Sequence, residues 1–107
     1  MKQTVALADG GKRVRVYATT KHLCVTRDVR CGRAIGSYII THRRSGWRVA
    51  WGFGQDLRLA RRWMRRFERE GGNWEYDWPQ VGVNHPTNYT RGVTLQRALR
   101  RELDGRP

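Results

Sequence analysis

The chain has 107 residues, a length typical of one compact domain, so we expect residues 1–107 to form a single domain. Its 22 Lys and Arg residues against 9 Asp and Glu give a formal net charge of +13, which favours a polyanionic partner. Hydrophobic residues make up 38% of the sequence, which is enough to exclude a disordered basic tail.

The sequence argues against several other classes of protein. Cys24 and Cys31 are its only cysteines, so we expect free thiols in a reducing compartment and no disulfide framework. No apolar run is long enough to cross a membrane, and the N-terminus lacks the apolar stretch of a signal peptide. We therefore expect a cytoplasmic protein without membrane association, in the host cytoplasm if a bacteriophage encodes it.

Short β-strands are expected in the N-terminal third of the chain. The β-prone runs at 4–7 and 13–17 flank a glycine-containing turn, so they predict a hairpin. Leu23 and Val25 alternate with other residues and predict a third short strand. The segment 28–36 has no period and contains two glycines, so it predicts a loop.

The clearest β pattern lies between residues 37 and 53. An apolar run at 38–40 precedes a turn at 43–46, and apolar residues then alternate with Arg48, Ala50 and Gly52. The alternating apolar residues are Trp47, Val49, Trp51 and Phe53. This pattern predicts a second hairpin with arginines at its turn.

Two helices are expected to complete the fold. Apolar residues recur at helical spacing over 57–70, with Asp56 as N-cap and a left-handed C-cap at Gly71-Gly72. The aromatic segment 73–92 predicts irregular structure, and 94–103 predicts a second helix. The expected fold class is α+β, with an antiparallel sheet of four or five strands packed by one long amphipathic helix, plus a C-terminal helix.

The helix expected at 57–70 carries the strongest functional signal. Its basic side chains share one arc opposite the apolar stripe, and they are Arg58, Arg61, Arg62, Arg65, Arg66 and Arg69. Like charges at i,i+4 repel by about 0.2–0.5 kcal/mol per pair, and only Glu68 and Glu70 offer relief. A merely solvated face and the arginine enrichment of a GC-rich genome are alternative explanations, but this repulsion favours an anionic partner.

Further basic and aromatic residues extend the candidate surface. Arginines at or beside the second hairpin turn are expected as secondary contacts, and they are Arg43, Arg44 and Arg48. The second helix adds Arg97, Arg100 and Arg101 opposite its apolar stripe. Aromatic residues that could stack on unpaired bases, or else pack in the core, are Tyr17, Trp74, Tyr76 and Trp78.

No catalytic residue, metal site or cofactor is predicted. Available zinc ligands are His22, Cys24, Cys31 and His85, but the cysteine spacing lacks the close pairs of zinc knuckles. The segment 84–88 offers His85 to a nuclease site, yet Glu75 and Asp77 are the only acidic ligands near it. His42 is interpreted as a surface histidine.

The segment from Gly36 to Phe67 resembles a known DNA-binding architecture. Its strand, its Ser45-Gly46-Trp47 turn, its second strand and its helix are similar to AP2-type and integrase arm-binding domains, over about a third of the chain. In those families the sheet lies in the major groove, but the clear third strand beside the helix is missing here. The composition also resembles small uncharacterised arginine-rich bacteriophage proteins.

These features predict a small basic protein that binds DNA or RNA through the phosphate backbone and is not an enzyme. The alternative is a phage-type interaction protein or inhibitor that docks its basic helix on an acidic surface of a host protein. Net charge alone does not separate the two, because both partners are polyanions.

Overall fold

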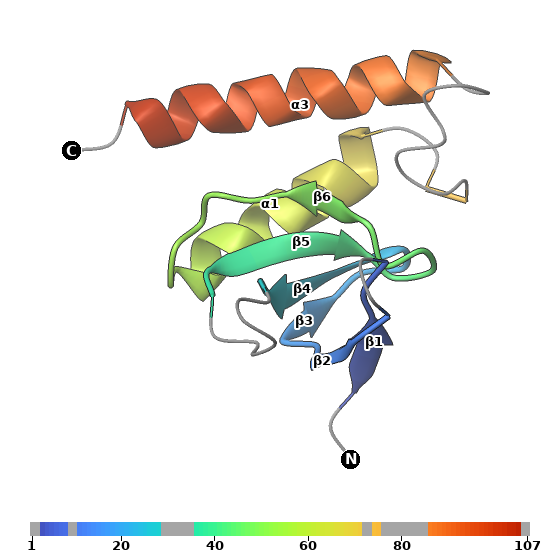
Figure 1. The fold of residues 1–107 in the computed structure, drawn as a ribbon. Helices are drawn as coiled ribbons and strands as arrows, with labels where there is room; N and C mark the ends of the chain where they lie inside the picture. The colour runs from blue at the N-terminus through green and yellow to red at the C-terminus, as the bar shows by residue number, and fades with distance from the viewer. Residues whose placement is uncertain (1–2, 9–10, 29–35, 72–73, 76–85, 106–107) are drawn as a thin grey trace.

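The computed structural model describes residues 3–8, 11–28, 36–71, 74–75 and 86–105, and it has an α+β fold (Figure 1). Within these residues the elements are β1 (Thr4–Ala6), β2 (Arg13–Arg15), β3 (Ala18–Thr19), β4 (Leu23–Arg27), β5 (Tyr38–His42), β6 (Arg48–Ala50), α1 (Leu57–Glu70) and α3 (Pro86–Asp104). Each strand pair is antiparallel. The predicted class and strand orientation are confirmed.

The strands form two sheets instead of one. β1 and β2 make a hairpin, and the four-stranded sheet has the order β3-β4-β5-β6. The predicted strand at 13–17 is divided between them, because β2 ends at Arg15 and the Tyr17 N–H then donates to the Val25 carbonyl at 2.9 Å. The uninterrupted β-prone run gives no sign in the sequence of this change of sheet.

The central strands β4 and β5 are buried on both faces. α1 packs against both strands on one side (Figure 1). On the other side, Cys24 packs with Val5 and Val14 of the β1–β2 hairpin. Thr26 and Thr41 are also fully buried, and a 3.0 Å hydrogen bond joins their hydroxyl groups. Polar positions of these strands therefore belong to the interior, where their hydrogen-bonding groups find partners.

A β-bulge breaks the alternation expected over 47–53. The pairing of β5 with β6 shifts register between Ile40 and Thr41, which leaves Val49 as an extra residue. Val49 is fully buried, whereas Trp47 and Trp51 are 40% and 43% exposed. The expectation that these tryptophans share one face with Val49 is therefore wrong, because the bulge changes the direction of Trp51 and Trp47 lies outside β6.

α1 begins and ends at the predicted residues. The Asp56 carboxylate accepts a 3.0 Å hydrogen bond from the Leu59 N–H and caps the first turn. The buried residues of the helix are Leu59, Ala60, Trp63, Met64 and Phe67. Gly71 has a φ of −80°, so Gly71 itself is not in the left-handed conformation predicted for Gly71-Gly72, and Gly72 lies outside the described residues. A Cβ at Gly71 would lie 2.6 Å from the Trp74 ring, so close packing explains this glycine.

α3 begins eight residues before the predicted start at Thr94. Pro86 is its first residue, and proline suits that position because the first turn of a helix needs no N–H donor there. α3 lies beside α1 and along β6 (Figure 1), and Gln96 donates from its side chain to the Val49 carbonyl.

Segments 29–35 and 76–85, predicted as irregular, lie outside the described residues. Neither described helix is both long and apolar enough to span a bilayer.

Candidate nucleic-acid interface

The structure places the six predicted arginines of α1 on one outer side. The apolar residues of α1 pack against β4 and β5, so the opposite side of the helix faces solvent. Five of these arginines are exposed and Arg66 is half-buried. We call this set the arginine face, and it consists of Arg58, Arg61, Arg62, Arg65, Arg66 and Arg69.

Three arginines of this face contact carboxylates. Arg62 lies 2.9 Å from Glu102 of α3, and Glu70 lies 3.4 Å from Arg66 and 3.1 Å from Arg69. The side chains of Glu102 and Glu70 are 37% and 44% exposed, so water screens these ion pairs. Surface pairs of this kind contribute about 0–1 kcal/mol each. An incoming polyanion can therefore compete for these guanidinium groups.

Arg58, Arg61 and Arg65 form the unpaired part of the face. Among the residues that the structure describes, none of these three side chains has a hydrogen bond or an ion pair. Arg61 and Arg65 are i,i+4 neighbours whose like charges repel. The arginine face therefore keeps a positive excess after Glu70 and Glu102 are taken into account, and an anion would relieve it.

An open pocket of about 280 Å³ lies at this face between α1 and α3, lined by Arg62, Trp63, Arg65, Arg66, Arg69 and Glu102. The Trp63 indole N–H donates to Glu102 at 2.9 Å, and the ring is buried, so it cannot act as a stacking platform. The remaining donors are guanidinium N–H groups, whose planar arrangement fits two oxygens of one phosphate. The pocket thus favours an anion of phosphate type.

The arginines of the β5–β6 turn are engaged by the backbone. Arg43 donates to the carbonyl oxygens of Thr20 and Lys21 at 3.0 and 3.3 Å. Arg44 donates to the Glu75 carbonyl at 2.6 Å. These bonds fix the turn against neighbouring loops. The structure therefore does not bring Arg43 and Arg44 onto the arginine face of α1.

Arg48 lies on β6, apart from the arginine face. Its guanidinium carbon is 4.8 Å from the centre of the Trp51 ring, within cation–π range. The Asp28 carboxylate lies 3.7 Å from the same guanidinium. The Arg48 guanidinium therefore packs on an exposed aromatic ring and does not belong to the arginine face.

The predicted stacking residues are not the exposed aromatics of the structure. Trp74 is buried and donates to the Phe67 carbonyl at 2.8 Å, and Tyr17 is half-buried against Tyr38. Tyr76 and Trp78 lie outside the described residues. The large hydrophobic residues that are exposed within the described part are Trp47 and Trp51. The sequence did not single out Trp51, because the bulge that turns it outward arises from strand pairing, and Trp47 lies in the turn before β6.

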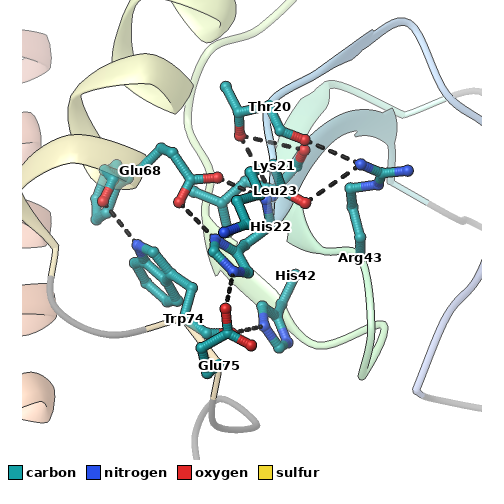
Figure 2. A network of polar contacts seen from close by, with 10 residues as sticks. Thr20, Lys21, His22, Leu23, His42, Arg43, Glu68, Trp74 and Glu75 are labelled. Carbon is teal, nitrogen blue, oxygen red and sulfur yellow. Dashed lines mark hydrogen bonds and ion pairs between the residues drawn. The ribbon is translucent and has the colours of Figure 1, made fainter.

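A polar network joins the C-terminal part of α1 to the turn before β4 (Figure 2). His22 Nδ1 lies 2.9 Å from a Glu68 oxygen, and Nε2 lies 2.8 Å from a Glu75 oxygen. The His22 backbone N–H also donates to Glu68. A protonated imidazole donates from both nitrogens, so it satisfies both carboxylates at once.

The same network includes His42, which is fully buried and not on the surface as predicted. Its Nε2 lies 2.8 Å from the Trp74 carbonyl, which can only accept, so this nitrogen carries a proton (Figure 2). Its Nδ1 lies 2.7 Å from the Ser45 hydroxyl. The two hydrogen-bond partners, one local and one far along the chain, explain why a polar residue is tolerated in the interior.

The pKa values of the network favour a charged His22. Partial burial lowers the pKa of His22, but hydrogen bonds to Glu68 and Glu75 outweigh this effect and raise it above its ordinary value of 6.5. For Glu68, burial raises the pKa, and hydrogen bonds from His22 outweigh that and lower it below 4.5. The hydrogen bond with His22 also lowers the pKa of Glu75.

We expect this network to stabilise the fold most between about pH 4.5 and pH 6.5. Because the pKa of His22 is raised, its contribution to stability is complete below pH 6.5 and is lost as the pH rises through the folded-state pKa. Because the pKa values of Glu68 and Glu75 are lowered, their contributions to stability are complete above pH 4.5. These contributions are lost as the pH falls through the folded-state pKa values. Thermal unfolding midpoints measured against pH should show this maximum, and His22→Gln should flatten it. An unchanged profile in the variant would contradict the assignment.

A zinc or nuclease centre gains no support. Cys24 is buried, and burial raises its pKa to about 12, so a metal-binding thiolate is disfavoured. Cys31, Asp77 and His85 lie outside the described residues. Among the residues that are described, no group of three His, Cys, Asp or Glu side chains could hold a metal ion.

Known proteins give no indication of what this surface binds. Comparisons with protein-family models, curated proteins and solved structures find no match to this chain. Function is therefore inferred from side chains. The arginine face of α1 has the most definite chemical preference among them, because it combines unpaired cations with an arginine-lined pocket.

Proposed function

We propose that the protein binds DNA or RNA through the phosphate backbone, with the arginine face of α1 as the primary contact. The observation that carries this proposal is the unpaired set Arg58, Arg61 and Arg65 beside a pocket lined by four arginines. Guanidinium groups bind phosphate in a two-pronged geometry, and each neutralised phosphate releases counterions. Both effects favour a nucleic acid over a single small anion.

Arg43, Arg44 and Arg48 are secondary contacts in this proposal. A guanidinium has five N–H donors, so a hydrogen bond to one or two carbonyls leaves others for a phosphate. Their role is to extend binding beyond α1 once the primary contact has formed. We propose a cytoplasmic binding protein that needs no metal or cofactor and performs no catalysis.

The test is whether nucleic acid accompanies the protein from cells. We expect freshly purified protein to have the high ultraviolet absorbance ratio of a nucleic-acid complex, and a high-salt wash to remove it. The rival is an inhibitor docked on an acidic host protein, which should capture one protein partner that survives nuclease treatment. A nuclease-resistant protein partner without bound nucleic acid would overturn the proposed function.

A further inference from the structure

A groove of about 290 Å³ lies on the β6 side of α3, apart from the arginine face. Ala50, Val93 and Leu99 give it apolar surface, and Trp51 lines it as well. The cationic residues that line it are Arg97 and Arg100. A flat aromatic ring beside two cations is an arrangement that suits a base and its phosphates.

Trp51 is held in place although its ring is exposed. The Arg48 guanidinium lies over the ring at 4.8 Å, and Arg48 is not among the described residues that line the groove. Gly52 turns the chain directly after Trp51 with a φ of +100°, and a Cβ there would lie 2.8 Å from the Leu103 side chain. The chain next to Trp51 therefore packs closely against α3, while the Trp51 side chain stays 43% exposed and lines the groove.

Arg97 and Arg100 are exposed and available to an anion. Within the described part of the chain, neither side chain makes a hydrogen bond or an ion pair. They are spaced i,i+3, so both project toward the same side of α3. Gln96, directly before Arg97 in the sequence, is already engaged, because its side chain donates to the Val49 carbonyl.

The size and charge of the groove favour one occupant. Its volume is slightly below the range of about 300–1,000 Å³ for small-molecule sites, so a helix of about 10 Å diameter from another protein would not fit. A duplex keeps its bases stacked inside, so it cannot offer one to Trp51. An unpaired base with its negatively charged backbone matches both the ring and the arginines.

We infer that this groove binds an unpaired base of a single-stranded nucleic acid, stacked on Trp51, with flanking phosphates on Arg97 and Arg100. The inference rests on the proposed function and deepens it, because it names single strands as the preferred substrate class. The groove and the arginine face lie on different sides of α3, since Glu102 contacts Arg62 whereas Arg97 and Arg100 line the groove.

The experiment compares a labelled single-stranded oligonucleotide with a duplex of the same sequence. Trp51→Ala should weaken single-strand binding about tenfold to a hundredfold, since one stacked base contributes on that scale. Duplex binding should stay within about twofold, because the groove makes no contact with paired bases. Trp51→Phe should restore part of the loss. Trp47→Ala is the matched control, since Trp47 is similarly exposed but does not line the groove.

Three outcomes would overturn the inference. Trp51→Ala could bind both oligonucleotides like the wild type, in which case the groove is not a base site although the proposed function stands. Trp51→Ala could also weaken single-strand and duplex binding equally, which would indicate a general effect and not base stacking. If the wild type bound neither oligonucleotide, both the inference and the proposed function would fail. Circular dichroism of each variant shows that the fold is retained.

Discussion

Replacing Arg58, Arg61 and Arg65 together by glutamine is expected to weaken nucleic-acid binding about tenfold to a hundredfold. This estimate assumes that each lost charge contact contributes about 0.5–1 kcal/mol at the surface. The three side chains have no partner within the described residues, so their removal leaves no carboxylate unpaired. Glutamine also keeps the helix propensity, and the loss of like-charge repulsion should leave stability equal or slightly higher.

The matched control removes three cations from the β1–β2 hairpin. Lys12→Gln, Arg13→Gln and Arg15→Gln lower the net charge by the same amount, and these exposed residues lie at the β1–β2 hairpin, outside α1. If affinity follows the arginine face, the hairpin variant should lose much less than the α1 variant. Equal losses would show that total charge, and not the placement of the arginines, governs binding.

Gly46→Ala is expected to destabilise the fold by about 2–5 kcal/mol, as the sum of left-handed backbone strain and overpacking. Gly46 has a φ of +76°, and a Cβ there would lie 2.1 Å from the Ala6 carbonyl oxygen and 2.6 Å from the Ala8 nitrogen. These are backbone atoms, which cannot rotate away. The Ala8 N–H also donates to the Gly46 carbonyl at 3.1 Å, so the β5–β6 turn and the strand β1 would separate.

Gly54→Ala separates the two causes. Gly54 also has a positive φ, +56°, but no atom of the described residues lies within 4 Å of the position of its Cβ. Only backbone strain applies there, so the expected loss is about 1–2 kcal/mol. Chemical denaturation of both variants measures the difference. A Gly46→Ala variant as stable as Gly54→Ala would show that the turn does not dock against β1.

Local patterns in the sequence were sufficient for α1 and for the first hairpin. The helical spacing over 57–70 and the Asp56 cap depend on neighbours within one or two turns, and both are confirmed. The hairpin of β1 with β2 is confirmed for the same reason, since its strands are close in sequence. The α+β class follows from these local elements.

Features that depend on distant contacts could not be predicted. The bulge that exposes Trp51 arises from the pairing of β6 with β5, and no local signal marks it. His42 looks like a surface residue until Trp74, far along the chain, supplies its hydrogen-bond acceptor. The polar network of His22 with Glu68 likewise joins segments 46 residues apart.

In the candidate site too, local features were predictable and features that depend on distant contacts were not. The shared arc of the arginines on α1 was predictable from helix geometry, and the structure places them together on one face. Their partners were not predictable, because Glu102 reaches Arg62 from another helix. The groove beside Trp51 also needs the packing of α3 along β6, which periodicity does not reveal.

The most direct test of the arginine face is the salt dependence of nucleic-acid affinity. A slope of log affinity against log salt counts the phosphates that a protein neutralises, at about 0.7–0.9 for each phosphate. Substitution of Arg58, Arg61 and Arg65 by glutamine should reduce the magnitude of this slope by about 2 to 3. A slope that is the same in the wild type and the variant would show that these arginines do not contact phosphate.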